Sequence, residues 1–363
     1  MQKIKNLEFL RVLLIIAVLA IHTCASGSFA LYKHFPQIDL YKYLHQCFIQ
    51  TNNAVEGFFI IAGFLLVITF KNTETTANFV KKKYIRFTPV IIFTTLIAII
   101  LSAFGILKCR LFGDLLTVLL VNHFGICFAT GSLPVLWFTS ALFAGLLLYF
   151  IILKNFWGKK LYGVLIFLVF ASYLILEILQ HGLFSHPHRN YYHIFNIGFL
   201  RSVGGIGLGV LTGFLYKNHL INKNIQEKFF PKTLYTISEI IFLSGIIWWL
   251  FFPHKIFNSI YFVIMFQILL LLFIMKKGYL SEFLNNDIWV KTGKYQYCVY
   301  VTHSVIGFVL LNKIWLKHPD FIAIHPFLPI IIANVMMIIC GILTYHMVEL
   351  PCGKYLKEKY EKR

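Results

Sequence analysis

Long apolar stretches alternate with short polar stretches along the whole chain. A helix that crosses a membrane needs about 20 mostly apolar residues, and ten runs come close to this length. We expect the membrane-spanning helices at 8–26, 52–70, 87–107, 137–153, 161–179, 198–216, 234–252, 256–275, 297–315 and 327–347. The stretch 111–129 is also apolar, but Asn122, His123 and Gly125 interrupt it, and we interpret it as a re-entrant or interfacial segment.

The composition excludes a soluble domain and a disordered chain. Hydrophobic residues make up 59% of the 363 residues and charged residues 13%, whereas a soluble domain carries about 25% charged residues. We therefore predict an all-α integral membrane protein, a polytopic bundle of about ten transmembrane helices. We expect one membrane domain over 1–363, with no separate soluble domain.

The net charge of +19 is best explained by topology. If the N-terminus is cytoplasmic, 24 of the 33 Lys and Arg residues fall in or beside cytoplasmic segments and nine on the other side. This bias agrees with the enrichment of basic residues in cytoplasmic loops. It predicts that both termini are cytoplasmic, and it makes a nucleic-acid partner unnecessary.

The first predicted span contains two ionisable residues, Arg11 and His22. Eleven residues correspond to about three turns and about 16 Å, so both lie on one helix face. Ionisable residues are costly inside a bilayer and commonly mark functional sites. We predict a shared polar channel, although a snorkelling Arg and a packed His would also fit.

The second predicted span places Glu56 at about the depth of His22. A carboxylate beside an imidazole raises its basicity, and such a pair suits a general base that takes a proton from a hydroxyl. A purely structural buried pair is the alternative.

A cationic cluster begins the third predicted span: Lys82, Lys83 and Arg86 lie just before Pro89. Guanidinium and ammonium groups bind phosphate oxygens well, so a cytosolic phosphorylated ligand is one interpretation. Anionic lipid or topology alone would explain the same charges. No CxxC pair occurs, and His186-Pro187-His188 cannot place both imidazoles on one helix face, so we expect no metal site.

Six motifs in order resemble those of the acyltransferase-3 family of bacterial membrane O-acyltransferases. The motifs are Arg11 with His22; Val55-Glu56-Gly57-Phe58-Phe59-Ile60-Ile61-Ala62-Gly63; Lys83-Tyr84-Ile85-Arg86-Phe87-Thr88-Pro89; Trp137-Phe138; the run from Tyr295 to His303; and Val348-Glu349-Leu350-Pro351. Two positions depart from the family pattern. Ala62 stands where the family has Ser, and Lys83 where it has Arg.

The resemblance implies transfer of an acyl group, usually acetyl, from acyl-CoA to a hydroxyl of an envelope glycan or its lipid-linked precursor. It also implies a multi-pass protein of the bacterial cytoplasmic membrane, with acyl-CoA, the glycan acceptor and membrane lipids as partners. A non-enzymatic polysaccharide exporter or flippase is the alternative function, and a scaffold for envelope synthesis is a weaker third. Inverted repeats would favour transport, and we find none in the sequence.

The resemblance also assigns roles to individual residues. His22 is the expected general base, Glu56 orients it, and Arg11 completes the catalytic set. The other candidates are grouped by ligand: Arg11, Lys82, Lys83 and Arg86 for the phosphates of acetyl-CoA, with His303 and Glu349 shaping the donor site, and Trp137 and Arg201 for the acceptor substrate.

Overall fold

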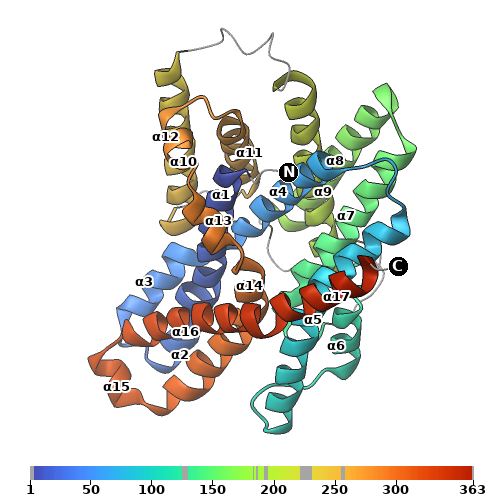
Figure 1. Ribbon diagram of the computed structural model, residues 1–363. Coiled ribbons are helices and arrows are strands. Elements are labelled where there is room, and N and C mark those ends of the chain that lie inside the picture. The colour runs from blue at the N-terminus through green and yellow to red at the C-terminus, as the bar shows by residue number, and fades with distance from the viewer. Residues whose placement is uncertain are drawn as a thin grey trace.

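The computed structural model is a bundle of helices (Figure 1). The structure describes residues 4–124, 130–182, 184, 187–191, 195–220, 231–254 and 258–361. Within these residues, the only strands are two of two residues each that pair antiparallel: β1 (Asn190–Tyr191) and β2 (Phe195–Asn196). The all-α prediction is confirmed.

Eight helical segments in the described ranges are long and apolar enough to cross a membrane. Several consist of consecutive helices without a break. They are α1–η1–α2 (Lys5–Ala20, Ile21–Gly27, Ser28–His34), α3–η2–α4 (Asp39–Phe48, Ile49–Asn53, Ala54–Thr69), α5 (Thr76–Ala103), η3–α7 (Pro134–Leu136, Trp137–Asn155), α8 (Gly158–Gln180), α9–η4 (Ile197–Leu215, Tyr216–Leu220), α10 (Lys232–Phe251) and α16–η8–α17 (Leu328–Thr344, Tyr345–Glu349, Leu350–Glu361).

The two remaining predicted spans also fold as helices. They are α11 (Ile260–Met275), which is 16 residues long, and α14–η6–η7 (Gln296–Val309, Leu310–Ile314, Trp315–Lys317). Four short helices connect longer ones: α6 (Leu111–Val118), α12 (Tyr279–Phe283), α13 (Asp287–Gly293) and α15 (Pro319–Ile324). Since α6 has eight residues, it is too short to cross a bilayer, as the sequence predicted for this stretch.

The first two helical segments extend well beyond their predicted ends, because α2 and α3 continue them. These extensions pack into a small apolar cluster of their own. Its buried members are Leu31, Phe35, Tyr41, Leu311, Ile322, Ile330 and Ala333. This cluster fixes one end of the bundle, where α15 and α16 meet α2 and α3 (Figure 1).

Helices α4 and α9 approach each other closely because glycines line their contact. A Cβ added to Gly209 would lie 1.9 Å from the carbonyl oxygen of Ile60. A Cβ added to Gly63 would lie 2.0 Å from the carbonyl oxygen of Ile206. Small residues are what allow helix backbones to pack this tightly in membranes. Gly63 and Gly209 therefore let α4 and α9 pack closely.

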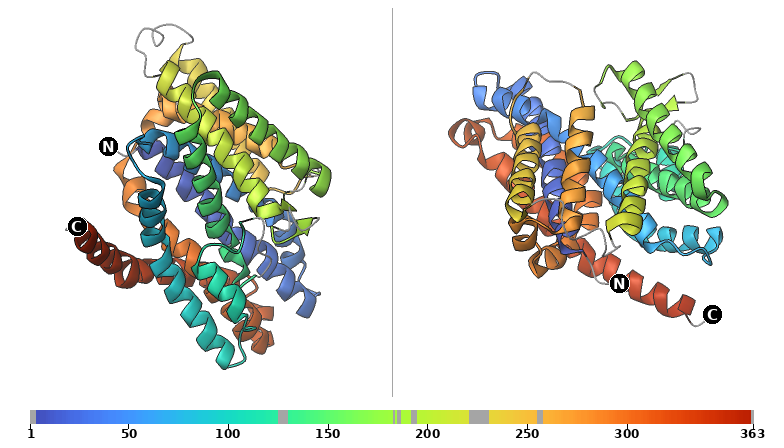
Figure 2. Two further views of the ribbon diagram at one scale, coloured as in Figure 1. Left: turned by 90° about the vertical axis from the view of Figure 1, so that its right-hand side faces the viewer. Right: turned by 90° about the horizontal axis from the view of Figure 1, so that it is seen from above.

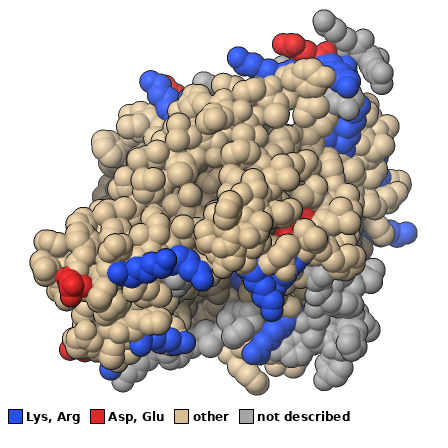
Figure 3. Space-filling view, turned by 90° about the horizontal axis from the view of Figure 1, so that it is seen from below, with Lys and Arg blue, Asp and Glu red and all other residues tan. Residues whose placement is uncertain are grey.

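Both ends of the described chain lie on the same side of the bundle (Figure 2). The face seen in Figure 3 is largely uncharged, and its basic side chains lie in separate groups, some of them beside a hollow. Two chain ends on one side of the bundle agree with an even number of membrane crossings. That this side is cytoplasmic stays a prediction.

Candidate functional site

Three of the predicted cations line one cavity of about 340 Å³, which we name the Arg11 cavity. Arg11 comes from α1, whereas Lys83 and Arg86 come from the first turns of α5 and lie three residues apart. Positions three apart share a helix face, so both α5 cations reach the same space. The structure thus brings together residues that are more than 70 positions apart in the sequence.

Lys82 does not belong to this set. Its ammonium group lies 2.7 Å from the Glu74 carboxylate, and its side chain is 73% exposed. One residue along a helix is a rotation of about 100°, which turns Lys82 outward while Lys83 points inward. The structure therefore does not bring Lys82 into the Arg11 cavity with the other two cations, and its part in binding a ligand stays a prediction.

The lining of the Arg11 cavity also contains neutral groups that suit an organic ligand. Both polar atoms of the Gln296 amide are buried without a hydrogen-bond partner. Arg11 is held by Glu8, whose carboxylate oxygen accepts a hydrogen bond from Nη1 at 3.1 Å. Ala62 also lines this space. Gln296 was missed by the sequence argument because an amide at a helix start has no distinctive pattern.

His22 lines a second cavity of about 380 Å³, the His22 cavity. The residue lies in η1, a π-helical stretch, and such insertions are frequent at functional sites because they redirect side chains. The adjacent Thr23 is anchored: its hydroxyl donates to the Leu19 carbonyl at 2.9 Å and accepts from the Asn334 amide at 3.0 Å. These bonds fix the backbone that carries His22.

The imidazole of His22 stacks obliquely against that of His303, with ring centroids 4.7 Å apart. His303 is fully buried, and its Nδ1 bonds the Tyr300 carbonyl. A carbonyl only accepts, so Nδ1 carries the proton and Nε2 of a neutral His303 is an acceptor. This Nε2 is buried without a partner. The sequence placed His303 at the donor site, whereas the structure places it beside His22.

The two cavities lie at different heights along one face of α14. Gln296 and Tyr300 line the Arg11 cavity, and Ser304 and Gly307 line the His22 cavity, at the three- and four-residue steps that share a helix face. Tyr300 lines the Arg11 cavity, and its hydroxyl donates to the carbonyl of Val135, a residue that lines the His22 cavity. Arg11 and His22, about 16 Å apart along one helix, therefore face two separate cavities. The single polar channel expected from their spacing stays a prediction.

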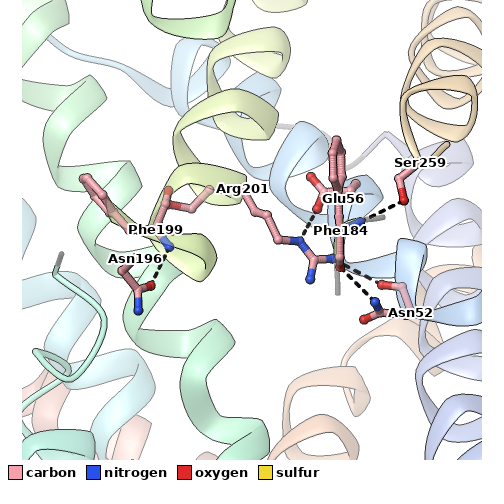
Figure 4. A network of polar contacts seen from close by, with 8 residues as sticks. Asn52, Glu56, Phe184, Asn196, Phe199, Arg201 and Ser259 are labelled. Atoms are coloured by element: carbon pink, nitrogen blue, oxygen red, sulfur yellow. Dashed lines mark hydrogen bonds and ion pairs between the residues drawn. The ribbon is translucent and has the colours of Figure 1, made fainter. Parts of the chain in front are cut away.

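Glu56 does not pair with His22. Its Oε1 lies 2.5 Å from Nε of Arg201, and both side chains are fully buried (Figure 4). Arg201 also donates to the Asn52 carbonyl at 3.3 Å. Helix packing turns this carboxylate toward Arg201 of α9. The prediction that Glu56 orients His22 is therefore wrong.

The buried pair belongs to a wider network that joins four parts of the chain (Figure 4). The Asn52 amide donates to the Phe184 carbonyl at 2.9 Å, and the Phe184 N–H donates to the Ser259 hydroxyl at 3.2 Å. Asn196 caps the start of α9 by accepting from the Phe199 N–H at 2.9 Å. Arg201 is thus held one turn inside a well-anchored helix.

Three of the predicted site residues contact other side chains and line neither cavity. They are Trp137, Arg201 and Glu349. The guanidinium carbon of Arg201 lies 5.2 Å from the Trp137 ring centroid, and both residues are buried. Neither is among the residues that line the Arg11 or His22 cavity. Glu349 accepts a hydrogen bond from the Cys298 thiol at 2.9 Å and so ties η8 to α14.

Two histidines pack together between α6 and α9, outside the membrane-spanning segments. The rings of His123 and His188 have centroids 5.3 Å apart. Burial, together with the neighbouring His188, lowers the pKa of His123 to about 3. Burial, together with the cation of Arg110, lowers the pKa of His188 to about 4. Both are neutral at pH 7. His186 and His193 lie outside the described residues.

A cationic cavity and a histidine pair at different heights along α1 and α14 are features of a membrane-embedded enzyme. The sequence profile described as an acyltransferase domain matches residues 4–346. The chain therefore belongs to the acyltransferase-3 family and is a multi-pass membrane acyltransferase. Neither the comparison with curated proteins nor that with solved structures gave a match.

Proposed function

We propose that the protein transfers an acyl group, acetyl in the simplest case, from cytosolic acyl-CoA to a hydroxyl of an envelope glycan or its lipid-linked precursor. One observation carries the proposal. In a chain of this family, Arg11, Lys83 and Arg86 gather in one cavity, while His22 and His303 meet at another height along α1 and α14. Donor and acceptor would thus bind from opposite sides.

The Arg11 cavity suits the donor because its polar groups match the parts of CoA. Arg and Lys bind phosphate oxygens through charge-assisted hydrogen bonds. The unpartnered amide of Gln296 can donate to and accept from an amide, and pantetheine contains two amides. The positive-inside rule places this end of α1 at the cytoplasm, where acyl-CoA is found.

His22 would act as the general base. As the acceptor hydroxyl attacks the thioester carbonyl, the hydroxyl proton passes to His22 and the new C–O bond forms. Collapse of the tetrahedral intermediate breaks the C–S bond, and the departing CoA thiolate takes the proton from His22. Free imidazole is thereby restored. His303 is suited to accept a hydrogen bond through its unpartnered Nε2.

The acyl group would pass directly from donor to acceptor. Ala62 lines the Arg11 cavity at the position where the family pattern has a Ser, so no hydroxyl is available there for a covalent acyl-enzyme. Glu56 and Arg201 would act as positioning residues, because their buried ion pair joins α4 to α9. We place the enzyme in the bacterial cytoplasmic membrane, with both termini in the cytoplasm.

Two measurements test the proposal together. The purified protein should bind CoA, and cells that lack the gene should lose acyl groups from an envelope glycan, with recovery on complementation. A cell that loses the glycan itself from its surface, with acylation of the remaining precursor unchanged, would support the exporter instead. A protein that binds no CoA would refute donor use.

A further inference from the structure

The His22 cavity carries its own positive charge. Lys108 and Arg110 line it together with His22, and no acidic residue is among its lining residues. The two cations lie in the segment just before α6, separate from the three cations of the Arg11 cavity. The proposed donor site does not use them.

Arg110 is held in place by the segment that leads into α7. Its guanidinium donates to the Thr130 hydroxyl, and its backbone N–H donates to the Ser132 hydroxyl at 3.0 Å. The two segments are packed backbone to backbone, because a Cβ added to Gly113 would lie 2.2 Å from the Thr130 carbonyl oxygen. The rim of the cavity is therefore a fixed structure.

Asp114, the carboxylate closest to Arg110 in the sequence, is held by Ser132. Asp114 is buried, and its two oxygens accept hydrogen bonds from the Ser132 N–H and the Ser132 hydroxyl, each at 2.6 Å. Within the described residues, neither Lys108 nor Arg110 forms an ion pair. The adjoining undescribed segment 125–129 contains no Asp or Glu. Among the residues that the structure describes, no carboxylate is therefore paired with Lys108 or Arg110.

The base of the cavity holds polar groups that can bind a hydroxylated ligand. The Ser304 hydroxyl lines the cavity, is buried and has no hydrogen-bond partner. His22 lies in the same lining. A cavity of about 380 Å³ falls in the size range of small-molecule sites. It combines hydroxyl-binding groups at the base with two cations at the rim that form no ion pair among the described residues.

We propose that the acceptor is anionic: Lys108 and Arg110 bind a phosphate or carboxylate group of the glycan or of its lipid carrier while the acylated hydroxyl lies at His22. This inference rests on the proposed function and names the acceptor's chemical class. Arg provides a planar fork and Lys a compact charge, and both select for such oxyanions. A neutral glycan would leave both cations without a counter-charge.

The test compares Lys108→Gln/Arg110→Gln with Lys42→Gln/Lys317→Gln in cells that lack the gene. The control removes two exposed cations that line neither cavity. Each variant is expressed at matched membrane levels, and acylated glycan fragments are measured by mass spectrometry. The first variant should lower acylation about tenfold to hundredfold, as expected for lost charge-assisted hydrogen bonds. Cells with the control variant should acylate the glycan to the wild-type level.

The acylated fragment found in wild-type cells decides the nature of the anion. A phosphate on the fragment or on its lipid carrier identifies one source, and a uronic or other acidic sugar identifies the other. A neutral acylated fragment without a phosphate-bearing carrier would overturn the proposal, as would normal acylation by Lys108→Gln/Arg110→Gln.

Titration of purified protein with CoA separates this inference from the proposed function. Unchanged CoA affinity in Lys108→Gln/Arg110→Gln, with lost acylation, supports an acceptor site. Weakened CoA affinity in this variant would overturn the inference and place the donor at the His22 cavity. No CoA binding by the wild-type protein, or no acylation lost on gene deletion, would mean that the proposed function itself has failed.

Discussion

Glu56 and Arg201 form an ion pair with no solvent-exposed surface, although 145 residues separate them in the chain. Their bond joins α4 to α9, the two helices that also pack through glycines. Taking charges out of water is costly, so a buried pair depends on both members. The relationship explains why a carboxylate occurs in an otherwise apolar helix without contact to His22.

Removing one member of this pair should destabilise the protein more than removing both. Glu56→Leu or Arg201→Leu leaves a buried charge without a partner, at a cost of about 3–5 kcal/mol. The double variant should recover part of this loss. Thermal unfolding of the detergent-solubilised protein measures the effect. Glu56→Gln should leave the pH profile of acyl transfer unshifted; a shifted profile would return Glu56 to the catalytic machinery.

His22→Ala should abolish acyl transfer while the protein inserts and unfolds normally. Losing a general base typically lowers a rate about 10²–10⁴-fold. His303→Ala should give a smaller loss, because it removes a neighbour of the base and not the base. His34→Ala is the matched control, since His34 is exposed. Glycan acylation in cells at equal membrane levels is the readout, and near-normal acylation by His22→Ala would contradict the mechanism.

The neighbouring residues Lys82 and Lys83 should behave differently. Lys83→Gln and Arg86→Gln each remove a cation that lines the Arg11 cavity, and each should raise the KM for acyl-CoA about tenfold or more. Lys82→Gln removes a surface cation paired with Glu74 and should leave this KM unchanged. Equal effects of Lys82→Gln and Lys83→Gln would indicate that only the overall charge near the membrane surface matters.

Gly209→Ala should disturb the α4–α9 contact. The new methyl group would meet the Ile60 carbonyl oxygen at 1.9 Å, and backbone atoms cannot move aside as a side chain can. Overpacking of this kind costs about 1–3 kcal/mol. Gly163→Ala in α8 meets nothing within 4 Å and is the control. Unfolding temperatures of the two variants should therefore differ; equal values would show that the contact is loose.

The sequence predicted the helices well because membrane thickness fixes the length of an apolar run. It underestimated the segments that start at Lys5 and Asp39, since α2 and α3 are too polar to be recognised as parts of spans. It could place Arg11 and His22 by depth along one helix. It could not place Glu56, because which way a side chain points around its helix depends on the neighbours chosen during packing.

The same limit explains the result at Lys82. In the sequence, Lys82, Lys83 and Arg86 look equivalent because they lie close together. Only the rotation of α5 against α1 and α14 distinguishes them. His303 was recognised as a candidate from its motif, but its position beside His22 depends on the packing of two helices from opposite ends of the chain. Arg201 was also recognised as a candidate, but its pairing with Glu56 was not predicted.

The hydrogen bond between Tyr300 and Val135, which line the two different cavities, has a consequence for the cell's energy supply. A bacterial membrane stores a voltage and a proton gradient, and a water-filled passage lined with Arg would dissipate both. Under the proposed function, an acyl arm has to pass between the two cavities while ions are kept out. The Tyr300–Val135 contact lies where such a passage would be interrupted.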